Sequence, residues 1–194
     1  ALDTEVFDKD ILEVGSYNVN GSVRAELEQR GPRSYIGVDL NEGPGVDRVV
    51  DAGNLVETFG AGQFDVVVST EMLEHAEDWR RVVSNLVAVV KPDGLLVLTT
   101  RALGFGHHCP PDWWRYSTAD FRRIFEGCEF LDLQEDTEFP GVSAKLRVPA
   151  DYELPDLTKI HLHPAPIDGR KLYPLTEADF ESVTRPHPSW GRTD

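Results

Sequence analysis

Short apolar runs alternate with amphipathic segments along residues 1–148 of the chain. Continuous runs rich in Val, Ile and Leu are typical of strands that are buried on both faces of a sheet. The runs predict strands over Ile11–Val14, Ser34–Val38, Arg48–Val50, Phe64–Ser69, Leu95–Thr100, Glu129–Gln134 and Ala144–Val148. Segments between most of these runs are long enough to hold a helix.

Helical periodicity is strongest after the fourth predicted strand. Apolar residues recur there at spacings of three and four, which predicts a helix over Glu77–Val90 with one buried face. Weaker patterns predict helices over Ser22–Arg30, Asn54–Phe59 and Ser117–Phe125, and the last of these begins with a sequence close to a capping box.

The alternation of strands and helices predicts an α/β fold with a doubly wound, mostly parallel sheet. The last two predicted strands have only the turn sequence Phe139-Pro140-Gly141 between them, so we expect an antiparallel hairpin at one edge. We assign residues 1–149 to this domain. The Pro-rich residues 150–194 are interpreted as an extension that wraps the core, covers the site or is partly disordered, with a short helix over Glu177–Val183.

Ligands of open α/β sheets bind at the carboxyl ends of the strands. Polar residues and one glycine follow four of the predicted strands in this chain. The candidate cofactor-binding residues are Glu13, Gly15, Ser16, Tyr17, Asn20, Asp39, Leu40, Asp51, Ala52, Ser69 and Glu71. An acid at the end of the second strand, here Asp39, can accept hydrogen bonds from both hydroxyls of a ribose.

The loop after the first strand separates two cofactor classes. A dinucleotide needs a G-x-G-x-x-G turn for its pyrophosphate, and Tyr17 and Val19 stand within this turn. S-adenosylmethionine has no phosphate, so Gly15 with small polar neighbours is sufficient. An NAD-binding oxidoreductase or epimerase stays as an alternative, as does a non-catalytic S-adenosylmethionine-binding module. Asp51 has a structural alternative as a helix cap.

In order and spacing, several segments resemble the class I S-adenosylmethionine-dependent methyltransferases, in particular small bacterial type 11 methyltransferase-domain proteins. These segments are Ile11–Gly15, Tyr35–Asp39, Asp51-Ala52, Phe64–His75 and Val90–Leu96. The resemblance implies a Rossmann-like, seven-stranded fold with an antiparallel last strand and S-adenosylmethionine as cofactor.

The same resemblance implies individual roles. Glu13 and Gly15 would line the methionine side, Asp39 would hold the ribose and Leu40 would pack by the adenine. Asp51 with Ala52 would meet the adenine edge, and Ser69 and Glu71 would face the cofactor. Tyr17 and Val19 depart from the family pattern, which has glycines at these positions.

The segment Arg101–Tyr116 carries the most reactive and aromatic side chains, and it follows a strand end. We therefore expect His107 or His108 to act as general base, with Asp112 in reserve. The candidate substrate-binding residues are His75, Trp113, Trp114, Arg115 and Tyr116. In the structural alternative the tryptophans pack on the core, Asp112 pairs with Arg115, and Glu74 and His75 cap the next helix. No full set of metal ligands accompanies the two histidines, so no metal is expected.

Composition and charge narrow the partners. The net charge of −15 argues against nucleic acid, and no apolar run approaches the ~20 residues of a membrane helix. Two cysteines give no disulfide framework, so we expect a cytoplasmic protein. The predicted function is methyl transfer to a small molecule, with a sugar or another hydroxylated metabolite as the acceptor. We allow for a homodimer.

Overall fold

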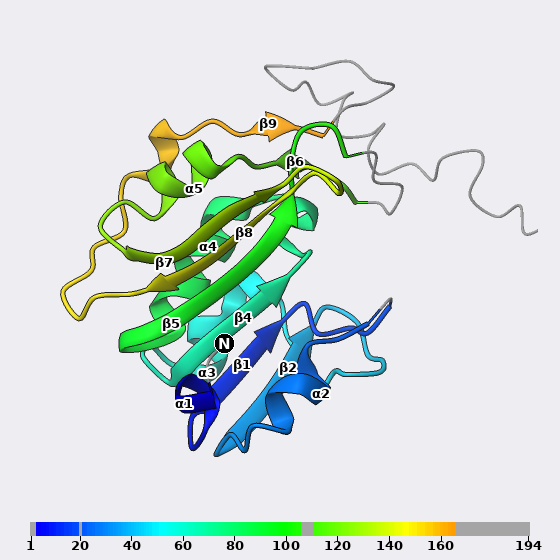
Figure 1. Cartoon of the computed structure of the whole chain (residues 1–194), viewed down its shortest axis with the longest axis vertical. Coiled ribbons are helices and arrows are strands. Elements are labelled where there is room, and N and C mark those ends of the chain that lie inside the picture. The colour runs from blue at the N-terminus through cyan, green and yellow to red at the C-terminus, as the bar shows by residue number, and fades with distance from the viewer. Residues whose placement is uncertain (1–2, 20, 106–110, 166–194) are drawn as a thin grey trace, which may run out of the picture.

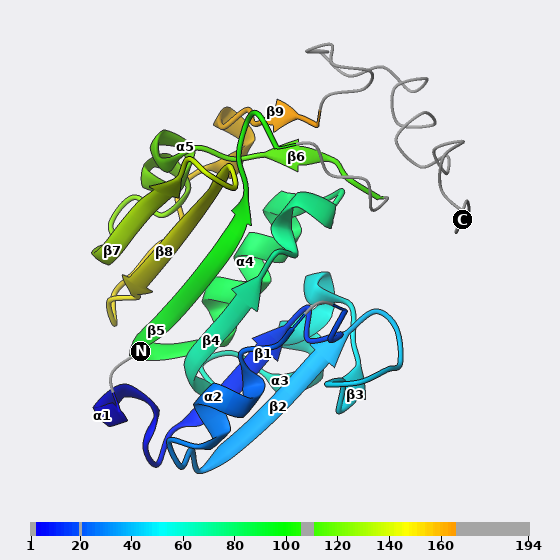
Figure 2. The same ribbon diagram turned by 45° about the vertical axis from the view of Figure 1, so that its right-hand side comes forward.

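A seven-stranded sheet forms the centre of the computed structural model, which describes residues 3–19, 21–105 and 111–165. The strand order is β3-β2-β1-β4-β5-β8-β7 (Figures 1 and 2). The strands are β1 (Asp10–Val14), β2 (Ser34–Asp39), β3 (Arg48–Val49), β4 (Phe64–Thr70), β5 (Val90–Arg101), β7 (Glu129–Asp136) and β8 (Gly141–Arg147). Strands β3, β2, β1, β4 and β5 pair in parallel, whereas β8 is antiparallel to both β5 and β7. The predicted α/β class and the antiparallel last strand are confirmed.

Helices cover both faces of this sheet (Figure 2). The α-helices are α1 (Asp3–Val6), α2 (Arg24–Glu28), α3 (Leu55–Phe59), α4 (Trp79–Val89) and α5 (Thr118–Ile124), and short 3-10 helices are η1 (Ala52–Asn54), η2 (Leu73–His75) and η3 (Leu157–Lys159). Apolar residues of α1 and α2 pack in one core cluster with β1, β4 and β5, whereas those of α3, α4 and α5 pack in another. The sheet is therefore doubly wound, as the sequence predicted. Within the described ranges, no helix is long and apolar enough to cross a membrane.

The apolar face predicted for α4 is the one that the protein buries. Trp79, Val83 and Leu86 of this helix are at most 1% exposed and pack on the sheet. Burying one such side chain contributes about 1.5–3 kcal/mol, so this helix anchors its face of the sheet. Asp78 caps it by accepting a hydrogen bond from the Arg81 N–H. The expectation that Glu74 and His75 form this cap is wrong, because both belong to the separate turn η2.

Strand β5 begins at Val90, earlier than the sequence predicted. Lys91–Gly94 lie outside the predicted strand over Leu95–Thr100, but they belong to β5 and their backbone is paired. The Asp93 N–H donates to the Val148 carbonyl at 2.8 Å, and the Val148 N–H donates to the Gly94 carbonyl at 2.9 Å. These bonds tie the start of β5 to the end of β8.

Residues 150–165 pack across the domain as a strap. Arg80 of α4 donates from Nε to the Leu157 carbonyl at 2.9 Å and from Nη2 to the Ile160 carbonyl at 2.7 Å. Leu157, Ile160 and Leu162 are buried in the core cluster of α4. Strand β9 (His163–Pro164) then pairs with β6 (Trp114–Arg115). The predicted helix over Glu177–Val183 lies outside the described residues.

The cap of α5 gives a direct stability test. Ser117 Oγ accepts from the Asp120 N–H at 3.1 Å, and Asp120 Oδ2 accepts from the Ser117 N–H at 2.9 Å, which completes a capping box. Ser117→Ala should lower the free energy of unfolding by about 1 kcal/mol in urea denaturation. Ser84→Ala is the matched control, because Ser84 lies inside α4 and alanine favours helix. Equal losses in the two variants would contradict the assigned cap.

Candidate functional site

The strand order reverses between β1 and β4, and the carboxyl ends of the parallel strands open at this point. Gly15 ends β1 with a φ of +80°, a backbone conformation that L side chains rarely adopt. A Cβ added at this position would lie 2.8 Å from Cβ of Met72, in the loop after β4. Gly15 is therefore required both by its backbone conformation and by the close approach of Met72.

The structure explains Tyr17, which stands where the family has glycine. Its ring lies against the backbone of Gly43 in the loop between β2 and β3, so that a Cβ at Gly43 would come within 1.9 Å of the ring. The residue without a side chain at this contact is thus Gly43 in the facing loop, whereas position 17 carries a tyrosine. Ser16 beside it is buried next to Gly37 and Gly45. The two loops close on each other without the second glycine of the usual motif.

Asp39 lies at the end of β2 and connects these loops. Its Oδ2 accepts from the Tyr17 N–H at 3.3 Å, and its Oδ1 accepts from the Asn41 N–H at 3.0 Å. The carboxylate is partly exposed, and each oxygen keeps a lone pair for another donor. The neighbouring Leu40 side chain is 66% exposed. Asp39 thus lies beside an exposed apolar side chain at the end of β2, and their expected roles at the ribose and adenine stay predictions.

Glu13 lies deeper than its neighbours at the rim. It is 2% exposed, and its Oε2 accepts from the Tyr35 hydroxyl at 2.8 Å. Burial raises the pKa of Glu13. The Arg24 guanidinium lies 5.0 Å from the centre of the Tyr35 ring. Tyr35 of β2 therefore fixes the Glu13 carboxyl, and Arg24 of α2 covers the Tyr35 ring.

The candidate residues near the ends of β3 and β4 differ in whether their side chains already have hydrogen-bond partners. Asp51 caps η1 through a 2.7 Å bond from the Gly53 N–H, as its structural alternative predicted, and Ala52 begins that helix. Ser69 is fully buried, and its Oγ has no hydrogen-bond partner among the described residues. Glu71 instead turns toward β5 with a φ of +54°, where Thr99 Oγ1 donates to its Oε1 at 2.8 Å and Arg101 pairs with its Oε2.

A second carboxyl, Glu74, lies fully buried behind Glu71. Thr100 Oγ1 donates to its Oε2 at 2.8 Å, and its backbone carbonyl accepts from the Trp113 N–H. Burial, followed by the negative charge of Glu71, raises the pKa of Glu74 to about 7. The sequence analysis considered this residue only as a cap.

The aromatic segment after β5 adopts the arrangement of its structural alternative. Asp112 and Arg115 form two short bonds of 2.5 and 2.6 Å, and Arg115 is fully buried. Trp113 is buried, the Trp114 Nε1–H donates to the Ala76 carbonyl at 2.9 Å, and the Tyr116 hydroxyl donates to the Leu73 carbonyl at 3.2 Å. These contacts position the segment against the loop after β4.

His75 joins that loop to the same segment through a contact between its Nδ1 and the Pro111 carbonyl. Three predicted positions lie outside the described residues: Asn20, His107 and His108. The structure thus brings Gly15, Tyr17 and Asp39 together, and it places the described part of the aromatic segment behind the loop after β4.

A cavity of about 500 Å³ lies next to Glu71, and the sequence analysis did not predict it. Its walls are Thr99–Arg101 of β5 and residues 134–139 and 141–143 of the β7–β8 hairpin. The available signal was topological. Strand β7 runs parallel to β5, so the turn that follows it lies at the carboxyl edge of the sheet.

A model of the methyltransferase domain matches residues 3–140. The chain belongs to the methyltransferase-domain family. Solved structures with this fold include S-adenosylmethionine-dependent methyltransferases, so the sequence resemblance to such methyltransferases is confirmed. One is the S-adenosylmethionine-dependent methyltransferase from Mesorhizobium loti, with a TM-score of 0.58, 16% identity, and coverage of 74% of this chain and 92% of that one.

A second structure similar to this methyltransferase domain contains ligands. It is 1,6-didemethyltoxoflavin-N1-methyltransferase from Burkholderia thailandensis with bound 1,6-didemethyltoxoflavin and S-adenosylhomocysteine. Its TM-score is 0.58 at 16% identity, with coverage of 74% of this chain and 72% of that chain. At this identity the likeness shows the fold.

Curated relatives of the methyltransferase domain are ubiquinone biosynthesis O-methyltransferases. The protein from Pseudomonas paraeruginosa is 36% identical over 107 residues, which are 47% of this chain and 44% of that protein. The protein from Escherichia coli O139:H28 is 32% identical over 108 residues, or 49% of this chain and 44% of that protein. The chain thus matches less than half the length of these relatives.

Among residues 3–19, 21–105 and 111–165 of the methyltransferase domain, no group of three or more His, Cys, Asp or Glu side chains is placed to hold a metal ion.

The raised pKa of Glu74 predicts a specific pH dependence. Between the ordinary carboxyl pKa of 4.5 and about 7, the folded protein keeps this proton and the unfolded chain loses it. The contribution of Glu74 to the free energy of unfolding therefore falls as pH rises through this window, and it levels off above the window. Glu74→Gln removes this contribution while the amide oxygen still accepts from Thr100. In urea denaturation, the variant should gain stability relative to wild type between pH 4.5 and 7.5.

The exposed Glu77→Gln serves as the matched control for this comparison. Parallel stability profiles of wild type and Glu74→Gln across the window would show that Glu74 does not titrate as described.

Proposed function

We propose that this domain transfers the methyl group of S-adenosylmethionine to a hydroxyl of a small polar molecule. The observation that carries the proposal is Asp39, whose carboxylate is fixed at the switch point of the sheet by two backbone N–H groups. A carboxylate that is oriented before binding can accept from both ribose hydroxyls without a cost in side-chain order. The family assignment favours S-adenosylmethionine over NAD.

The described residues fit this cofactor on structural grounds. Gly15 turns the backbone at the end of β1 with a positive φ, Leu40 offers an exposed apolar side chain beside Asp39, and the unpartnered Ser69 Oγ lies at the end of β4. We propose that Gly15 and Ser69 border the methionine part. Asp39 would hold the ribose, and Leu40 and Asp51 would border the adenine.

When bound, S-adenosylmethionine supplies a methyl group on a sulfonium, which is already a good leaving group. The residues of this chain therefore have to align the acceptor and exclude water rather than activate the methyl group. A hydroxyl acceptor must also lose a proton. We propose His107 or His108 for this role, because the described ends of their segment contact Arg101 through Phe105 and His75 through Pro111. Asp112 is held by Arg115, which makes it the weaker candidate.

Two findings support oxygen as the methylated atom and a small acceptor. The curated relatives are O-methyltransferases at 36% and 32% identity, although they are matched over less than half of their length. The cavity beside Glu71 has the volume of a small-molecule site, about 500 Å³. We propose this cavity as the acceptor site.

Isothermal titration of S-adenosylmethionine against variants of one loop tests the cofactor assignment. Asp39→Ala should weaken binding by about tenfold or more, because the ribose would lose a charged hydrogen-bond acceptor. Glu42→Ala is the matched control, since it removes an exposed acid from the same loop and should leave binding within about twofold. Unchanged affinity in Asp39→Ala, or tighter binding of NAD than of S-adenosylmethionine, would refute the proposal.

A further inference from the structure

The loop between β2 and β3 contacts the loop after β1 through its backbone. The Asn18 N–H donates to the Pro44 carbonyl at 2.8 Å. A Cβ added at Gly45 would lie 2.5 Å from the Ser16 carbonyl oxygen, so a larger residue there would push the two loops apart. Each loop therefore limits the positions that the other can take.

The β2–β3 loop is itself fixed by charged side chains. Asp47 Oδ2 accepts from the Gly37 N–H at 2.7 Å and from Arg24 Nη1 at 2.8 Å. Arg24 Nη1 also donates to the Gly45 carbonyl at 3.2 Å. Because Gly37 belongs to β2 and Arg24 to α2, these bonds hold the loop against two elements of the domain. The loop can therefore serve as a support for the loop after β1.

The Tyr17 ring rests on this support at Gly43. The three atoms nearest to a Cβ at Gly43 all belong to the ring, and two of them, Cδ2 and Cζ, would lie 2.5 and 2.9 Å away. Gly43 does not have a positive φ, so its backbone conformation would also suit alanine. Glycine is therefore needed at position 43 because of the ring and not because of the backbone.

The backbone of Tyr17 leads directly to Asp39. The Tyr17 N–H donates to Asp39 Oδ2 at 3.3 Å, and the Asn41 N–H donates to Oδ1 at 3.0 Å. One donor comes from the loop after β1, and the other comes from the β2–β3 loop. The orientation of the Asp39 carboxylate therefore depends on how the two loops pack on each other.

We propose that Tyr17 and Gly43 are positioning residues through which the domain distinguishes ribose from deoxyribose. The inference rests on the proposed function, in which Asp39 accepts from both ribose hydroxyls. The ring on Gly43 fixes the Tyr17 backbone, and the Tyr17 N–H then holds Asp39 Oδ2 before the cofactor binds. Tyr17 thus acts through Asp39, and its own hydroxyl has no part in this role. A carboxylate without this support would have to be ordered on binding, which costs free energy.

Ribose discrimination is the readout that separates this role from a general loss of stability. It is the ratio of the Kd of the 2′-deoxy analogue of S-adenosylhomocysteine to the Kd of S-adenosylhomocysteine, both measured by isothermal titration against the full chain. Wild type should discriminate by about tenfold, because the analogue lacks one hydroxyl that donates to a charged acceptor. Partial unfolding would weaken the binding of both ligands equally and leave the ratio unchanged.

Three variants test the contact between the ring and Gly43. Gly43→Ala places a methyl group where the ring lies, so the discrimination should fall to about twofold or less, and S-adenosylhomocysteine should bind about fivefold more weakly. Tyr17→Gly removes the ring without adding atoms and should have the same effect, even if Gly43→Ala fails to fold. The combination of both changes should also weaken binding by about fivefold rather than by the product of the two losses, because the effects of residues in contact do not add.

Two further variants serve as controls. Tyr17→Phe keeps every ring atom that meets Gly43, so its discrimination should exceed that of Tyr17→Gly by about threefold or more. Glu42→Ala removes an exposed side chain next to Gly43, and its discrimination should stay within about twofold of wild type.

Full discrimination in Tyr17→Gly or in Gly43→Ala, or losses that multiply in the combined variant, would overturn the inference. Equal discrimination in Tyr17→Phe and Tyr17→Gly would also overturn it, because the effect would then belong to the hydroxyl. If wild type fails to bind S-adenosylhomocysteine, or binds the two ligands equally, the proposed function fails instead, so the two failures are distinguishable.

Discussion

The parallel pairing of β1 with both β2 and β4 is the constraint on which the site depends. β1 is paired on both edges and apolar on both faces, so its register with its neighbours is fixed by burial. Because the three strands run in the same direction, Gly15, Asp39 and Ser69 all reach one edge of the sheet. The loops there can differ in length and composition without moving the strand ends.

The loop after β1 shows how the family pattern can change without loss of the arrangement. Tyr17 occupies a position that is usually glycine, and Gly43 on the facing loop supplies the space that its ring needs. Its backbone N–H still reaches Asp39. The two loops still approach closely, but the glycine that permits this lies in the loop between β2 and β3 and not in the loop after β1.

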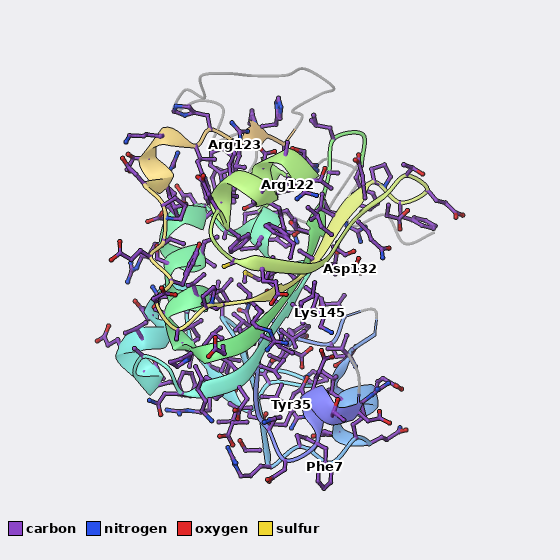
Figure 3. The ribbon with its side chains drawn as sticks, turned by 60° about the vertical axis from the view of Figure 1, so that its left-hand side comes forward. Phe7, Tyr35, Arg122, Arg123, Asp132 and Lys145 are labelled. Carbon is purple, nitrogen blue, oxygen red and sulfur yellow. The ribbon has the colours of Figure 1, made fainter. Side chains whose placement is uncertain are left out.

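The part of the site that holds the proposed acceptor cavity depends on the β7–β8 hairpin. Strand β8 inserts between β5 and β7 and brings the turn of residues 137–140 to the same edge as the loop after β4. The Glu71–Arg101 pair lies between the two halves. Figure 3 labels Asp132 of β7 and Lys145 of β8, which belong to the hairpin. One half carries the residues proposed for the cofactor, and the other carries the cavity proposed for the acceptor.

Much of this arrangement could be predicted from the sequence. The strands, the periodic face of α4 and the hairpin follow from apolar patterning, because burial of those residues determines where they lie. The inward turn of Glu74 and the packing of Tyr17 on Gly43 could not be predicted. Each depends on contacts between segments that are distant in the chain, and local patterns do not encode such contacts. The strap of residues 150–165 was interpreted from its prolines as an extension, and its packing through Leu157 and Arg80 depends on one well-placed arginine.

Hydrogen–deuterium exchange with and without S-adenosylhomocysteine tests the central claim most directly, namely that the carboxyl ends of β1, β2 and β4 together bind the cofactor. The account predicts slower exchange in residues 13–19, 37–41, 51–55 and 69–75 when the ligand is added, and little change in the outer half of β7. Protection confined to other segments, or no protection at all, would contradict it.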